Sequence, residues 1–181
     1  MRVLVAGLGV QGYKRREHAG KDYIASVDPA NMEAEYRKIQ DVPLDSYDAV
    51  LACIPDAPKI ELLRYCLNNK KHVLVEKPLW TENDQQIKDL EKLARKNQIV
   101  CYTAYNHRFE PHFIKMRDLI ETGSLGKIYS CRMFYGNGTS RLVRDSLWRD
   151  KESGVLNDLG SHLLDTCRFW FGINLGAFDL L

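Results

Sequence analysis

A lysine stands where a buried strand is expected to end. Residues 73–75 are apolar on both faces, as in a central parallel strand, and Glu76, Lys77 and Pro78 follow them directly. In open parallel α/β sheets, ligands bind just beyond the carboxyl ends of the strands. Lys77 is therefore either a solvated cap on the strand or a group that takes part in chemistry, and its neighbours in sequence leave both alternatives open.

A second group of polar residues lies near the end of the sequence, in GVLNDLGSHLLD. Asp158 and His162 are four residues apart, so on a helix they share a face, and Asp165 follows one turn after His162. A carboxylate beside a histidine orients the imidazole and raises its basicity, as a general base near neutral pH requires. Spacing alone favours an ordinary polar pair on a solvated helix, and a catalytic pair is the alternative.

Glycines follow the first expected strand in the sequence VAGLGVQG. Gly7, Gly9 and Gly12 fit the GxGxxG pattern at the start of an expected helix. In a dinucleotide site these glycines allow a tight turn, close approach of the backbone to the pyrophosphate, and close packing of helix on strand. The helix N-terminus adds N–H groups and the positive end of its dipole. Three ordinary turn glycines are the alternative, but Asp28 ends the next expected strand at the spacing that the dinucleotide motif requires.

Asp28 also bears on which dinucleotide binds. A carboxylate at this place accepts hydrogen bonds from the ribose hydroxyls and repels a 2′-phosphate. We therefore expect NAD as the cofactor, with NADP bound more weakly. Lys14, Arg15 and Arg16 on the first helix would soften that preference.

The first hundred residues alternate between strand and helix patterns. Strands are expected at 2–7, 23–28, 49–55, 72–75 and 99–105, and helices at 10–20, 57–71 and 81–97, the last with Thr81 as its N-cap. The segment 31–47 lacks a well-formed helix. This alternation predicts an α/β fold, a Rossmann-type parallel sheet with helices on both faces.

The pattern changes after Tyr105. A helix is expected from Pro111 and a last helix at 157–172. A half-buried strand is expected at 127–135, with one face formed by Tyr129, Cys131, Met133 and Tyr135. We predict a dinucleotide-binding domain at 1–122 and a partial α+β substrate and dimerisation domain at 123–181.

Four segments in this order, VAGLGVQG, KKHVLVEKPL, YNHRF and GVLNDLGSHLLD, resemble the glucose–fructose oxidoreductase/inositol dehydrogenase (Gfo/Idh/MocA) family. The resemblance implies a Rossmann domain joined to a substrate domain built on an open, mostly antiparallel sheet. It also implies oxidation or reduction of a carbon in a sugar, cyclitol or nucleotide sugar with NAD or NADP.

The resemblance assigns roles to individual residues. Lys77 polarises or positions the reacting oxygen, His162 exchanges the proton and Asp158 orients His162. A cis bond is expected between Lys77 and Pro78. The cofactor-binding set implied is Gly7, Gly9, Val10, Gln11, Gly12, Asp28, Cys53, Ile54, Pro55, Glu76 and Lys77. Asn106 and Arg108 are the substrate-binding set, and for Arg108 a structural salt bridge is the alternative.

The chain departs from the family pattern in two ways. IPDAPK stands where the family usually has TPN-x-x-H, so that Asp56 and Lys59 occupy the polar positions. Family members are also roughly twice as long, near the two-domain expectation. A dinucleotide-binding protein without catalysis, or one completed by another chain, is therefore the alternative function.

Composition excludes several classes of partner and site. The net charge of +2 indicates no nucleic-acid or acidic-membrane partner, and the five scattered cysteines have no metal-ligand spacing. Unpaired thiols in apolar segments, with no signal peptide and no membrane span, predict a cytoplasmic protein. The edge of the expected strand 127–135 and the nearby aromatic residues predict a homo-oligomer.

Overall fold

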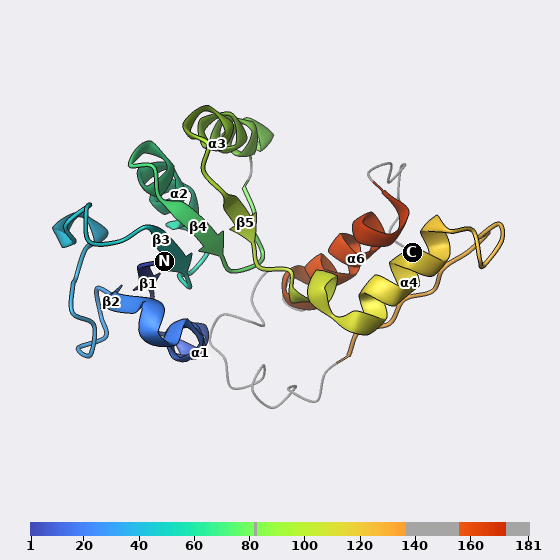
Figure 1. Ribbon diagram of the computed structural model, residues 1–181, viewed down its shortest axis with the longest axis horizontal. Helices are drawn as coiled ribbons and strands as arrows, with labels where there is room; N and C mark the ends of the chain where they lie inside the picture. The colour runs from blue at the N-terminus through green and yellow to red at the C-terminus, as the bar shows by residue number, and fades with distance from the viewer. Residues whose placement is uncertain (82, 137–155, 173–181) are drawn as a thin grey trace. The chain divides into compact units, whose positions relative to one another are not determined.

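The computed structural model describes residues 1–81, 83–136 and 156–172 (Figure 1). They belong to two compact units, Met1–Ala104 and Tyr105–Leu181, which are described separately below. The predicted domain boundary after residue 122 stays a prediction, since compactness within one chain does not measure independent folding. No described helix is long and apolar enough to cross a membrane.

The first unit contains a five-stranded sheet in which every pair of neighbouring strands is parallel. In spatial order the strands are β2 (Tyr23–Val27), β1 (Val3–Ala6), β3 (Ala49–Ala52), β4 (His72–Val75) and β5 (Cys101–Thr103). The chain runs outward from β1 in both directions, so the strand order reverses between β1 and β3. That reversal is the place where open α/β sheets bind ligands.

Helices cover both faces of this sheet, as the alternation predicted. Leu4 and Ala6 of β1 belong to one core with Leu63 of α2 (Lys59–Asn68) and Leu90 of α3 (Asp84–Asn97). Val5, which points to the opposite face, belongs to a second core. On that side α1 (Val10–Ala19) follows β1, and Figure 1 shows it away from the neighbouring helices α2 and α3.

The crossover between β2 and β3 forms no α-helix in the structure, as expected for 31–47. It contains one short 3-10 turn, Ile39–Asp41, and an isolated bridge between Val27 and Tyr36. The Glu35 carboxylate fastens this segment to β2. It accepts hydrogen bonds from Ser26 N, Ser26 Oγ and the Tyr23 hydroxyl at 2.6–2.9 Å.

Helix α3 begins later than predicted. Asn83, and not Thr81, caps it: the Asn83 side chain accepts a hydrogen bond from Gln85 N at 2.9 Å. Asparagine is at least as good an N-cap as threonine, so the residue nearer the helix takes the position.

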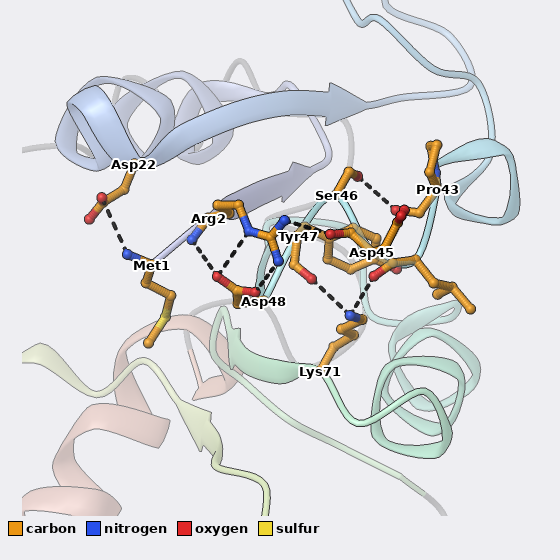
Figure 2. Close-up of polar contacts among 10 residues, drawn as sticks. Met1, Arg2, Asp22, Pro43, Asp45, Ser46, Tyr47, Asp48 and Lys71 are labelled. Carbon is orange, nitrogen blue, oxygen red and sulfur yellow. Dashed lines mark hydrogen bonds and ion pairs between the residues drawn. The ribbon is translucent and has the colours of Figure 1, made fainter.

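Side-chain bonds join the segments before the strands at the amino-terminal edge of the sheet, opposite the carboxyl ends of the strands (Figure 2). Arg2 Nη2 lies 2.6 Å from Asp48 Oδ1, and the Arg2 backbone N–H donates to Asp48 Oδ2 at 2.8 Å. Lys71, just before β4, donates to the Tyr47 carbonyl at 2.8 Å. These contacts join the starts of β1, β3 and β4.

The regular secondary structure of the second unit is helical over its described residues. Helix α4 (Pro111–Glu121) follows a 3-10 turn, Asn106–Phe109, and α6 (Ser161–Phe171) follows a π turn, Leu156–Gly160. Trp170 of α6 stacks on Phe113 of α4 and donates from Nε1 to the Phe113 carbonyl at 3.0 Å. The helices predicted from Pro111 and near 157–172 are confirmed.

The strand predicted at 127–135 is wrong, since these residues form no strand. A strand needs backbone groups of a neighbour, and the described part of this unit offers only helices. Of the predicted inner face, Met133 and Tyr135 are half-buried, whereas Tyr129 is 83% exposed.

Candidate active site

The tight turn after β1 requires glycine at two positions. Gly7 has φ +90°, and a Cβ there would lie 2.5 Å from the Cys53 carbonyl oxygen. A Cβ on Gly12 would lie 1.9 Å from the Gly7 carbonyl oxygen. Both distances are far inside van der Waals contact, so the turn and the packing of α1 against it exclude any side chain here.

The third glycine of the motif, Gly9, has a different environment. Gly9 is the N-cap of α1, and nothing lies within 4 Å of the place a Cβ would occupy. Within the described part of the chain, no side chain caps α1 and its first turn holds no acidic residue. The N–H groups of Val10, Gln11 and Gly12, which have no acceptor one turn earlier in the helix, are thus available to an anion. This arrangement fits the pyrophosphate of a dinucleotide.

Asp28 lies directly after β2 and organises the loop beside the glycine turn. Its carboxylate accepts hydrogen bonds from Leu8 N at 2.8 Å, Ala30 N at 2.9 Å and Asn31 N at 2.8 Å. Partial burial raises the pKa of Asp28, but these three N–H groups and nearby Arg37 outweigh it and lower the pKa overall. The carboxylate therefore stays charged, with three of its about four acceptor sites in use.

Two further residues of this loop were not predicted. Asn31 donates to the Leu8 carbonyl at 3.1 Å and to the Tyr13 hydroxyl at 2.9 Å, and so fastens the loop to the glycine turn. The Arg37 guanidinium donates to the Asn31 carbonyl at 2.5 Å and to the Asp28 carbonyl at 3.2 Å. Neither residue belongs to a recognisable motif, since most of these bonds go to backbone carbonyls that any sequence supplies.

The loop after β3 lies against the glycine turn. Cys53 N donates to the Ala6 carbonyl at 2.7 Å, which continues the pairing of β1 and β3 by one residue. Burial raises the pKa of the Cys53 thiol to about 12, and the charge of Glu76 adds to the effect. The thiol is thus a packing group and no nucleophile at neutral pH.

The turn after β4 carries Lys77. Glu76 N donates to the Ala52 carbonyl at 2.9 Å, and the Lys77–Pro78 bond is cis, as expected. Lys77 itself is half-buried. The Glu76 carboxylate pairs with Arg15 of α1 at 2.6 Å, and the Pro78 carbonyl accepts a hydrogen bond from Lys59 of α2 at 2.7 Å. Sequence reasoning placed Arg15 and Lys59 near the cofactor but did not predict these bonds.

The glycine turn, Asp28, the loop at 53–55 and Lys77 thus follow the carboxyl ends of β1, β2, β3 and β4 in turn. In a parallel sheet these ends lie along one edge. The structure therefore brings the predicted cofactor residues and Lys77 together within the first unit.

In the second unit, His162 stands at the centre of an aromatic cluster. Its side chain is 7% exposed, and its ring centroid lies 4.8 Å from that of His107, 5.7 Å from Tyr135 and 5.8 Å from Tyr105. Asp158 precedes it within the π turn and is half-buried. His107, which was not predicted, lies 2.7 Å from Glu110 Oε1 through Nδ1.

The two predicted substrate-binding residues lie in the turn before α4. Asn106 is exposed and donates to Glu110 Oε1 at 3.0 Å. Arg108 donates to both carboxylate oxygens of Asp165 at 2.6–3.0 Å, and its guanidinium lies over the Phe169 ring. This geometry favours the structural salt bridge, the alternative that the sequence left open.

A cavity of about 470 Å³ lies between α4, α6 and the segment 125–135. His107, His162 and Thr166 contribute polar groups, and most of the other lining side chains are apolar. The described residues hold no group of three histidine, cysteine or acidic side chains able to bind a metal ion.

The parallel sheet, the glycine turn and Asp28 define a Rossmann domain built for a dinucleotide. Residues 1–105 match the model of an oxidoreductase family with an NAD-binding Rossmann fold, and residues 113–175 match the GFO/IDH/MocA C-terminal domain. The chain belongs to the Gfo/Idh/MocA family of oxidoreductases.

Several relatives have been named. A myo-inositol 2-dehydrogenase of Thermotoga maritima is 34% identical over 69% of this chain and 36% of its own length. A scyllo-inositol 2-dehydrogenase (NADP(+)) of Bacillus subtilis is 29% identical over 70% of this chain and 35% of its own. An uncharacterized oxidoreductase of Schizosaccharomyces pombe is 32% identical over 76% and 37%. The chain spans well under two thirds of the length of each of these relatives.

Solved structures show the same fold. The myo-inositol 2-dehydrogenase of Lactobacillus plantarum superposes with a TM-score of 0.80 at 19% identity, over 95% of this chain and 56% of that one. An inositol dehydrogenase homolog of Azotobacter vinelandii, crystallised with NAD+, gives a TM-score of 0.73 at 21% identity, over 94% and 53%.

Proposed function

We propose that the protein is an NAD-dependent oxidoreductase that transfers hydride between the nicotinamide and a hydroxyl-bearing carbon of a cyclitol, sugar or nucleotide sugar. The observation that carries the proposal is the gathering of the glycine turn, Asp28 and Lys77 at one edge of a parallel sheet. The names of the relatives favour a cyclitol over the other two substrate classes.

The backbone of the glycine turn and the first turn of α1, with Gly7, Gly9, Val10, Gln11 and Gly12, would hold the pyrophosphate. The fourth acceptor site of Asp28 would receive a ribose hydroxyl. Cys53, Ile54, Pro55 and Glu76 would line the nicotinamide side. When bound, NAD accepts the hydride or returns it.

The remaining chemistry falls to three side chains. Lys77 would donate a hydrogen bond to the reacting oxygen, which stabilises the negative charge that develops on that oxygen as its proton is removed and before hydride leaves the carbon. His162 would take the hydroxyl proton as general base, and Asp158 would orient its imidazole. Asn106, exposed in the turn before α4, is the proposed substrate contact.

We propose NAD over NADP by about tenfold or more, since charged hydrogen bonds contribute about 1.5–3 kcal/mol and a 2′-phosphate would meet the Asp28 carboxylate. Arg37 lies beside this position with its guanidinium bound to two carbonyls. Replacement of Asp28 by alanine should narrow the gap between the two cofactors. Equal affinity of the unchanged protein for NADH and NADPH would contradict the preference.

Fluorescence titration with NADH, followed by a panel of cyclitols, sugars and nucleotide sugars read at the nicotinamide absorbance, tests the function. Lys77→Ala and His162→Ala should each lower the rate of the hydride step by about 10²–10⁴-fold and leave NADH affinity nearly unchanged. Unchanged turnover in either variant removes that residue from the mechanism. Tight binding of NADH without turnover on the whole panel would favour the alternative, a dinucleotide-binding protein without catalysis.

A further inference from the structure

We propose that Arg15 and Lys59 are positioning residues that hold Lys77 at the carboxyl edge of the sheet from both sides. This inference rests on the proposed role of Lys77 in catalysis. Neither residue would touch the reacting atoms. Each acts on a residue next to Lys77 in sequence, Arg15 on Glu76 and Lys59 on Pro78.

The first anchor is the ion pair between α1 and the residue before Lys77. Arg15 Nε and Nη2 lie 2.7 and 2.6 Å from Glu76 Oε1, and the side chains are 31% and 15% exposed. Such partly buried, charge-assisted bonds are stronger than those of a solvated surface pair. Glu76 is also held through its backbone, because its N–H donates to the Ala52 carbonyl.

The second anchor is a lysine that is almost completely buried. Lys59 is 2% exposed, and its ammonium donates to Asp56 Oδ1 and to the Pro78 carbonyl, both at 2.7 Å. An ammonium group taken out of water is costly unless such partners satisfy it. The buried ammonium at the start of α2 is therefore satisfied by a carboxylate and by the Pro78 carbonyl, which fixes the peptide between Pro78 and Leu79, one residue after Lys77.

Both anchors also reach the parts that would hold the cofactor. Arg15 lies in the helix that begins at the glycine turn, and Asp56 follows the loop at 53–55. The turn 76–78 is thus tied to two of the segments that would contact the dinucleotide. The position of Lys77 relative to a bound nicotinamide would be set by these two bonds and by the strand.

The test measures the accessibility of the Lys77 amine directly, so that it does not depend on turnover. Each protein is labelled with a trace of an acylating reagent, and the rate at Lys77 is compared by mass spectrometry with the rates at exposed Lys38, Lys88 and Lys115. In Arg15→Met and in Lys59→Met, the relative rate at Lys77 should change by about threefold or more, because the turn samples other conformations once an anchor is lost.

Two variants serve as matched controls. Lys71→Met removes a lysine that also donates to backbone carbonyls, but at the opposite edge of the sheet (Figure 2). Arg95→Met removes a guanidinium that pairs with Glu91 on the exposed face of α3. Both should leave the relative rate at Lys77 unchanged. Melting temperatures of all four variants are measured in parallel, and Arg15→Met keeps the test decisive if Lys59→Met does not fold.

An unchanged Lys77 rate in Arg15→Met, with the variant folded, would overturn the inference for Arg15, and the same result in folded Lys59→Met would overturn it for Lys59. A rate that shifts equally in the controls would show general destabilisation instead and would also overturn it. Protection of Lys77 by NADH in the unchanged protein tests the proposed function separately. If NADH gives no protection while the anchor variants alter the rate, the role of Lys77 fails and the anchors stand.

Discussion

The three glycines of the first turn have different roles, and the space around each of them separates these roles. Gly7 and Gly12 leave no room for a Cβ, because backbone carbonyls stand 2.5 and 1.9 Å from it. At Gly9, by contrast, nothing lies within 4 Å of the place a Cβ would occupy. Two of the glycines are therefore required by the fold, whereas the third has no such requirement and is the one that the proposed dinucleotide would explain.

This division predicts opposite outcomes for two alanine variants. Gly12→Ala should lower the free energy of unfolding by about 1–3 kcal/mol, since helix α1 must move away from the turn to relieve the clash. Gly9→Ala should melt at nearly the same temperature as the unchanged protein but bind NADH more weakly, because its methyl group would stand in the path of the pyrophosphate. Thermal unfolding and NADH fluorescence together check both outcomes. Wild-type affinity in Gly9→Ala would show that the pyrophosphate does not pass there.

At the scale of helices and strands, local patterns predicted the first unit well. Apolar runs such as residues 73–75 indicate buried strands, and each strand predicted within residues 1–105 has its counterpart in β1 to β5. The wrong predictions concern segments whose structure depends on a second part of the chain. Residues 127–135 alternate as a strand does, but no neighbouring strand is present among the described residues. Thr81 was predicted as the N-cap of α3, but Asn83, two residues later, takes that position.

The candidate site shows the same limit. The glycine turn, Asp28 and the EKP lysine are contiguous motifs, so sequence was sufficient to name them. Arg15 and Lys59 contact residues 61 and 19 positions away, and no local pattern announces such bonds. His107 is a further example, since only the packing of α6 against the turn before α4 brings it to His162.

The ion pair between Arg2 and Asp48 gives a prediction about pH. Hydrogen bonds from the Arg2 guanidinium and backbone N–H hold the pKa of Asp48 well below its usual range. A carboxyl group whose pKa is lower in the folded than in the unfolded state stabilises the fold above its unfolded pKa of about 3.9. That stabilisation is lost as the pH falls from there through the folded pKa.

We therefore expect Asp48→Asn to melt at a lower temperature than the unchanged protein at neutral pH, and the difference to shrink below about pH 4. Melting curves from pH 7 down to the acid limit of folding check this. The exposed pair Arg95–Glu91 provides the comparison, and Glu91→Gln should have a smaller effect at every pH. A constant difference across the whole range would mean that Asp48 acts through shape and not through charge.

At the scale of the molecule, the second unit exposes large apolar side chains. Tyr129 is 83% exposed and Phe134 is 93% exposed, and the cavity between α4 and α6 opens beside the same segment with a mostly apolar lining. Exposed apolar side chains that gather in one segment are a feature of interaction sites in proteins that are otherwise polar outside. With the predicted strand absent, this surface, and no longer a sheet edge, is the physical basis for expecting self-association.

The chain should accordingly associate with itself at micromolar concentration, through the segment 123–136 and the helices beside it, while the first unit folds without them. Phe134→Ser combined with Tyr129→Ser should weaken association, since both side chains would lose their favourable burial between copies. Val100→Ser, which alters an apolar side chain 60% exposed in the first unit, should not. Sedimentation velocity of the three proteins measures the effect.

A chain that ends after Thr122 should sediment as a monomer, bind NADH and show no turnover, because Asp158 and His162 are missing from it. A full chain that remains monomeric at micromolar concentration would contradict this prediction.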